Sequence, residues 1–133
     1  MSVSVRRDVV ILACAISAGI HGALVPEHLD ESAAAGRAFA SSTVILAVLV
    51  LALTRRPAAR APLLLAAATL AGLLVAYALA ITTGLPLLHP EPEPVEGLAL
   101  VTKAIEAAGL VAAWSLLRGE RAVALVTPQT KGI

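Results

Sequence analysis

Aromatic and charged residues are both scarce in this chain of 133 residues. It holds one Phe, one Tyr and one Trp, and Asp, Glu, Lys and Arg make up 14% of it, about half the share that is usual in soluble domains. A disordered chain needs more charge and a stacking platform for nucleic acid needs more aromatic rings, so both classes are excluded. The single cysteine, Cys14, cannot form an internal disulfide, and we interpret it as a buried thiol without a redox role.

Aliphatic residues take the place of the missing types, and 59% of the chain is hydrophobic. Four apolar segments cover residues 9–25, 38–53, 62–85 and 98–117. A membrane-spanning helix needs about 20 apolar residues, with about 17 as the lower limit. The last two segments reach this length, and Arg37 can extend the second by snorkelling. We therefore predict an all-α fold: residues 1–133 form one integral membrane domain, a four-transmembrane-helix bundle built of two antiparallel helical hairpins.

The basic residues predict the orientation of these helices. Eight of the ten flank the termini or the connection between the second and third segments: Arg6, Arg7, Arg55, Arg56, Arg60, Arg118, Arg121 and Lys131. The two opposite loops carry one basic residue, Arg37, and six carboxylates: Glu27, Asp30, Glu31, Glu91, Glu93 and Glu96. Basic loops stay in the cytoplasm, so we predict a multi-pass protein of the cell (plasma) membrane with both termini cytoplasmic and two acidic outer loops.

Small residues recur every four positions in three of the segments. Ala15, Gly19 and Ala23 form such a repeat in the first segment, and similar repeats occur in the third and fourth. In lipid, small residues let helix backbones approach closely. The repeats favour a compact bundle but assign no neighbours, so the predicted partners are the lipid bilayer and either another membrane protein or a second copy of the chain.

All three histidines lie toward the outer side of the predicted membrane. His28 and Glu31 are three residues apart and would share a face if the helix continues beyond Pro26. Imidazole and carboxylate together suit a divalent transition metal such as Zn, Mn, Fe or Cu(II). The ligands of this hypothetical metal site are His21, His28, Glu31 and Glu106. The alternative is that these are polar residues at the membrane interface, and we interpret His89 and the proline-rich run after it as solvated.

Two charged residues, Lys103 and Glu106, lie inside the fourth apolar segment. A charge at the centre of a spanning helix costs about 2.5–3.5 kcal/mol on insertion scales, so it requires a reason. Their i, i+3 spacing predicts a structural ion pair on one helix face. The alternative is that Glu106 faces the bundle interior, toward His21 and Glu31, and completes a buried polar cluster.

No arrangement of catalytic residues can be recognised. The serines lack a base in a nucleophile arrangement, and no glycine-rich phosphate loop follows a strand. A haem ligated by His21 would need a second axial histidine within the membrane, and the other helices have none. The sequence therefore favours a protein without enzymatic activity and leaves a membrane enzyme or redox protein as an open alternative.

The outer-loop motifs resemble those of uncharacterised small four-helix membrane proteins of high-GC actinobacteria. The residues that carry the resemblance are Gly22, Pro26-Glu27-His28, Glu31, Gly36, Gly84-Leu85-Pro86, Pro92-Glu93-Pro94 and Glu106. Members of that group usually have an Arg before the Gly-Leu-Pro run, where this chain has Thr82-Thr83. The resemblance implies the four-helix topology and no particular activity.

Two function hypotheses follow. The first is a small polytopic membrane protein that acts as a non-catalytic accessory or interaction subunit and contacts a partner through its acidic outer loops. The second is a cation-binding membrane protein with an outer-face site of histidine and carboxylate for a divalent transition metal, serving transport, sensing or delivery. Convergence of the four candidate ligands in space would favour the second.

Overall fold

The structure is a computed structural model that describes residues 1–57, 59–88 and 90–126, and the backbone alone for residues 120–126. His89 and Lys131 thus lie outside the described residues. The described part forms four helices: α1 (Val3–Glu31), α2 (Ala33–Arg55), α3 (Arg60–Thr82) and α4 (Gly97–Val126). Each is long and apolar enough to cross a membrane, so the prediction of an all-α fold with four such helices is confirmed.

A single residue, Ser32, separates α1 from α2. Its backbone N–H donates to the carbonyl of His28 at the end of α1, and its hydroxyl accepts from the N–H of Ala35 at the start of α2. One side chain therefore caps the second helix at the point where the first one ends. The turn is tight, because a Cβ on Gly36 would lie 2.9 Å from Cα of Leu29.

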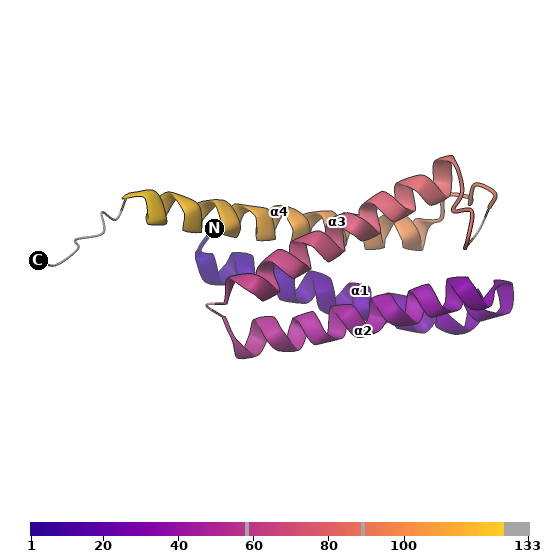
Figure 1. Ribbon diagram of the computed structural model, residues 1–133, viewed down its shortest axis with the longest axis horizontal. Helices are drawn as coiled ribbons and strands as arrows, with labels where there is room; N and C mark the ends of the chain where they lie inside the picture. The colour runs from indigo at the N-terminus through magenta and orange to yellow at the C-terminus, as the bar shows by residue number, and fades with distance from the viewer. Residues whose placement is uncertain (58, 89, 127–133) are drawn as a thin grey trace, which may run out of the picture.

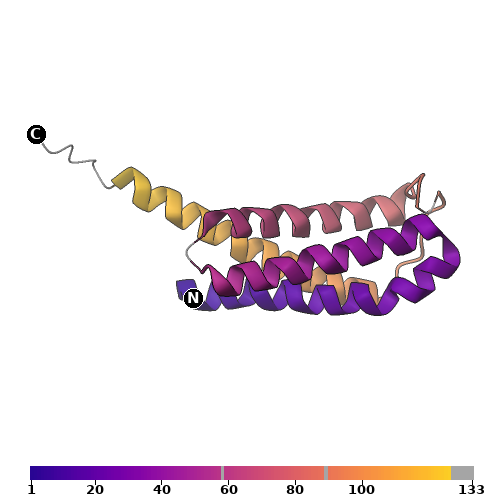
Figure 2. The same ribbon diagram turned by 60° about the horizontal axis from the view of Figure 1, so that its bottom comes forward.

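Both of these helices are longer than the sequence predicted. The apolar segments stop at residue 25 and resume at residue 38, whereas the helices run on to Glu31 and begin again at Ala33. Helical hydrogen bonds do not require apolar side chains, and alanine is the strongest helix former. Pro26 lies inside α1, where it removes one backbone donor, and Figure 2 shows α1 bending in its last turns.

The third helix ends at a left-handed glycine. Thr83 caps α3, and Gly84 follows with φ of 71°, a conformation that glycine adopts without strain. The described parts of the next segment, residues 83–88 and 90–96, contact the ends of α3 and α1. The N–H of Glu93 donates to the carbonyl of Ala80 at 3.0 Å, and the hydroxyl of Ser32 donates to the carbonyl of Leu88 at 3.3 Å.

The four helices lie roughly side by side in one bundle (Figure 1). Helix α1 packs most extensively against α2 and then against α4, and α3 packs mainly against α4. We call the end where α1 and α3 begin the basic end; it carries Arg6, Arg7, Arg55, Arg56 and Arg60. We call the opposite end, with Ser32 and the segment 83–96, the acidic end; it carries Glu27, Asp30, Glu31, Glu91, Glu93 and Glu96.

Large aliphatic side chains fill the half of the bundle next to the basic end. The bulky apolar residues with less than 2% exposure are Val10, Leu46, Leu53, Leu63 and Leu70. Where this core meets the other half, α4 approaches α1 through Gly109, since a Cβ there would lie 2.5 Å from Cβ of Ala13. The backbones touch at the level where the polar residues of α1 and α4 begin.

The predicted small-residue repeat of α1 faces outward, whereas those of α3 and α4 each include a buried alanine, Ala80 and Ala112. Ala15, Gly19 and Ala23 are exposed on α1, and a Cβ on Gly19 would meet nothing within 4 Å. Helix α1 instead packs against the other helices with its opposite face, which carries the buried Ala13 and Ala18. Spacing alone did not distinguish these two faces, because α1 is rich in small residues on both.

Candidate functional site

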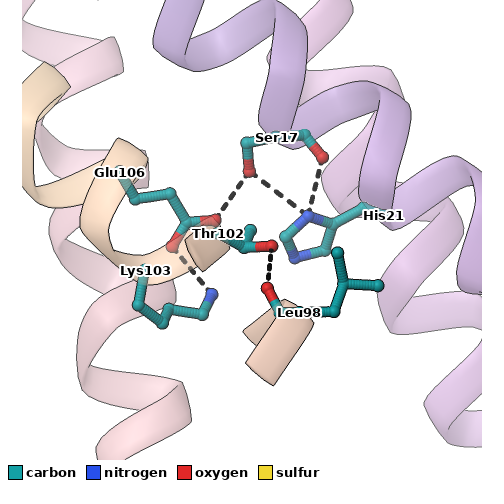
Figure 3. Close-up of polar contacts among 6 residues, drawn as sticks. All are labelled: Ser17, His21, Leu98, Thr102, Lys103 and Glu106. Atoms are coloured by element: carbon teal, nitrogen blue, oxygen red, sulfur yellow. Dashed lines mark hydrogen bonds and ion pairs between the residues drawn. The ribbon is translucent and has the colours of Figure 1, made fainter. Parts of the chain in front are cut away.

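The buried polar residues all lie in the half of the bundle toward the acidic end. Among the described residues they are Ser17 and His21 on α1 and Thr102 and Glu106 on α4. Figure 3 shows these side chains meeting between the two helices. The hydroxyl of Thr102 donates to the carbonyl of Leu98 in its own helix at 2.8 Å, so it needs no partner from α1. The other three form a connected network.

Glu106 is the centre of this network. Its side chain is 0% exposed. Its Oε1 accepts a hydrogen bond from Ser17 Oγ at 2.6 Å, and its Oε2 lies 2.7 Å from Nζ of Lys103 (Figure 3). Lys103 also lies 5.6 Å from the centre of the Tyr77 ring. Both oxygens of the carboxylate are thus occupied, one by a cation in the same helix and one by a hydroxyl from α1.

This geometry contains the predicted ion pair of Glu106 and part of the alternative cluster, which includes His21 but not Glu31, because Glu31 pairs with His28. The i, i+3 ion pair with Lys103 is present. Glu106 also faces the interior and reaches His21 through Ser17. A buried ion pair stabilises a fold little or not at all compared with apolar residues of the same size. The second contact, which crosses between helices, is therefore the more informative one about function.

The network orients the imidazole of His21, which is 7% exposed. Its Nδ1 lies 2.9 Å from the carbonyl oxygen of Ser17 and 3.3 Å from Ser17 Oγ. A carbonyl oxygen only accepts, and the hydroxyl proton already goes to Glu106, so Nδ1 carries a proton. In the neutral ring the lone pair is then on Nε2. No described residue offers Nε2 a hydrogen bond, and Figure 3 shows it turned away from Ser17.

A second pair lies about two helical turns further toward the acidic end. Nδ1 of His28 is 2.8 Å from Oε2 of Glu31, as the continued helix required. The ring of Phe39, on α2, lies between the two histidines, with its centre 5.2 Å from that of His21 and 3.7 Å from that of His28. His21, Phe39, His28 and Glu31 thus form a continuous surface.

This surface is one wall of a cavity of about 330 Å³ at the acidic end. Helix α3 contributes Leu73 and Tyr77 to its lining, and the segment after α3 contributes Leu85 and Leu88. The charged residues that line it are Glu27, Glu31, Glu93, Glu96 and Lys103. Since Lys103 is paired with Glu106, the remaining charge is that of four carboxylates.

The structure divides the four predicted metal ligands into two groups. His28 pairs with Glu31, while His21 connects through Ser17 to Glu106. In the described part of the chain, no three residues of the types His, Cys, Asp and Glu are grouped so that they could hold a metal ion. The donor set therefore fits a resident metal poorly, and the metal site stays a prediction.

Three residues of the site were not selected from the sequence. Ser17 was considered only as a nucleophile, although it precedes His21 by four residues and so shares its helix face. Phe39 and Tyr77 come from helices whose neighbours the sequence did not assign. The scarcity of aromatic residues could have pointed to them, because the chain has three such residues and two of them line this cavity.

A groove of about 760 Å³ lies along the α1–α4 surface nearer the basic end, with Arg6 and Ser115 among its lining residues. It is open and almost wholly apolar, like a surface that acyl chains cover. The cavity at the acidic end is the one at which buried polar groups converge.

Comparison of the chain with models of protein families, with curated proteins and with solved structures gave no match.

Proposed function

We propose that the protein is a multi-pass integral protein of the cell membrane, with the basic end in the cytoplasm and the acidic end outside. Four apolar helices support the insertion, and the separation of charge between the two ends supports the orientation. The test uses single cysteines in a Cys14→Ala background. Val95→Cys should react with a membrane-impermeant thiol reagent on intact cells, and Pro57→Cys only after permeabilisation. The reverse pattern would invert the orientation.

We propose further that the cavity at the acidic end binds a cation. The observation that carries this is the position of His21: its imidazole is nine-tenths buried and lines a cavity with four carboxylates, and no described residue offers a hydrogen bond to its Nε2 lone pair. Intramembrane ionisable groups are costly. This protein uses a Lys, a Glu and a Ser to hold one imidazole in one orientation, which is more than a polar side chain at the interface needs.

The experiment is thermal unfolding of the full chain in detergent, with and without panels of divalent metal ions and of small ammonium ions. A ligand that binds the folded state raises the melting temperature by mass action. We expect at least one of the two classes to do so, and Glu31→Gln combined with Glu93→Gln to abolish the shift. Asp8→Asn removes a carboxylate at the basic end and should leave the shift intact. If neither class of cation raises the melting temperature, the proposal is rejected.

A second candidate function is that of an accessory or interaction subunit. It is favoured by the outward face of α1, where Ala15, Gly19 and Ala23 leave room for another helix to approach. In a Cys14→Ala background, Gly19→Cys should then cross-link to a second copy or to another protein in native membranes. Val75→Cys, which is exposed on α3, is the matched control. Equal cross-linking at both positions, or none at either, would argue against a specific contact.

A further inference from the structure

The size and the lining of the cavity indicate which class of cation it binds. A volume of about 330 Å³ is the share of about ten water molecules and lies at the lower end of the range for organic ligands. A single metal ion would leave most of this space to water. The described residues also lack a three-donor group for a metal.

Most of the wall is apolar. Leu24, Leu73, Leu85 and Leu88 face the cavity together with alanines from α2 and α3. A hydrocarbon or aryl group would be in contact with this apolar part of the wall on several sides. The chemistry of the wall thus calls for a ligand with an apolar body.

The polar groups call for a positive charge that can donate a hydrogen bond. The orientation of His21 makes its Nε2 an acceptor. Beside it lies the ring of Phe39, whose face attracts cations, and next to that ring stands the His28–Glu31 pair. A protonated amine can interact with all three groups. Its N–H donates a hydrogen bond to the imidazole, and its positive charge is attracted by the aromatic face and by the carboxylate.

We propose that the ligand of this cavity is an amphiphilic organic monocation, a protonated amine carried on an apolar body. In this arrangement His21 and Glu31 contact the ammonium group, Phe39 stands beside it, and the body packs on Leu73 and the Tyr77 ring. Glu106 acts as a positioning residue, because both of its oxygens are occupied by Ser17 and Lys103. The inference rests on the proposed cation-binding function.

Three probes that share one body but differ in the head group test it: 2-phenylethylammonium, its N,N,N-trimethyl derivative, and the neutral 2-phenylethanol. Binding to the full chain is measured by equilibrium dialysis in detergent micelles, with the Asp8→Asn variant as the matched control. We expect saturable binding of both cations to wild type and to the control variant, and binding of the alcohol that is weaker by about tenfold or more.

Two variants separate the hydrogen bond from the charge. His21→Ala should lower the affinity for the primary ammonium by about tenfold and hardly change that for the trimethyl compound, which has no N–H to donate. Glu31→Gln should lower both affinities alike. Phe39→Leu gives an independent test that leaves the buried network in place, and it should weaken both cations while sparing the alcohol.

The outcomes that overturn the inference differ from those that overturn the proposed function. If divalent ions raise the melting temperature and no ammonium compound binds, the ligand is a metal and the organic cation is rejected, while cation binding stands. If the alcohol binds as tightly as the amines, the positive charge is irrelevant and the inference falls. If no cation of either class binds, the inference and the proposed function both fall.

Discussion

The two halves of the bundle are built from the same four helices but bury different kinds of side chain. Toward the basic end, large aliphatic residues such as Leu46, Leu53 and Leu63 interlock with almost no exposure. Toward the acidic end, the buried positions are small or polar, among them Ser17, His21 and Glu106. A cavity takes the place of a core there.

This difference in buried side chains indicates that the basic half stabilises the bundle and that the acidic half holds the candidate site. In lipid, helices associate through close packing, because the surrounding tails are as apolar as leucine, and the basic half supplies that packing. The acidic half replaces packing with a cavity, an ion pair and an oriented imidazole. The contact of Gly109 with Ala13 joins the two halves, so it holds α1 and α4 at the spacing that the hydrogen bond from Ser17 to Glu106 needs.

The largest loss of stability is expected from breaking the ion pair in the acidic half. Lys103→Met leaves the fully buried Glu106 without its counter-ion and should cost about 3–5 kcal/mol of stability. Adding Glu106→Gln should recover most of this loss, because the remaining group is neutral. Reversible unfolding in mixed detergent micelles measures both. Arg118→Met, which removes an exposed cation from the same helix, is the control; a double variant as unstable as Lys103→Met would mean that the pair is not the reason.

A smaller effect is expected in the basic half. Leu53→Ala removes a side chain that is 1% exposed and should cost about 2 kcal/mol, the low end for a buried leucine, since the unfolded chain remains in an apolar solvent. The same change at Leu64, which is 44% exposed, should cost much less. Cation binding at the acidic end should persist in both variants at temperatures where they are folded. Equal losses at the two positions would show that the basic half is not a packed core.

The junction of the halves should respond to a single methyl group. Gly109→Ala places a Cβ 2.5 Å from Cβ of Ala13, and overpacking of this kind costs about 1–3 kcal/mol, partly offset by the better helix propensity of alanine. Gly19→Ala meets nothing within 4 Å and should be neutral or stabilising. Gly109→Ala should also weaken cation binding, because it separates Ser17 from Glu106. Unchanged stability and binding together would contradict the close contact.

The smallest effect concerns Tyr77, whose hydroxyl is buried without a hydrogen-bond partner among the described residues. Tyr77→Phe removes this unsatisfied group and keeps the ring, so it should stabilise the ligand-free protein by about 1 kcal/mol. Thermal unfolding without added cations is the measurement. Phe39→Tyr, which places a new hydroxyl beside the cavity, is a useful comparison. A lower melting temperature in Tyr77→Phe would mean that the hydroxyl has a partner.

Much of the architecture could be predicted because the membrane imposes simple rules on sequence. Long apolar segments and clustered charges identified four helices of spanning length. The extent of α1 was underestimated at Pro26, because polarity marks where a helix leaves the membrane and not where its hydrogen bonds end. The pairing of His28 with Glu31 was conditional on that helix continuing, and it does continue.

The sequence by itself determined which residues are costly to bury, and therefore which ones require an explanation: His21, Lys103 and Glu106. Local spacing also determined the ion pair within α4, since residues three apart share a face of any helix. Only the tertiary structure decided that Ser17 bonds Glu106, 89 positions away in the sequence, and so connects it to His21. It also decided that two rings, from α2 and α3, line one cavity. Neighbours between helices depend on which face packs inward. In α1 both faces carry small residues, so only the packed bundle distinguishes them.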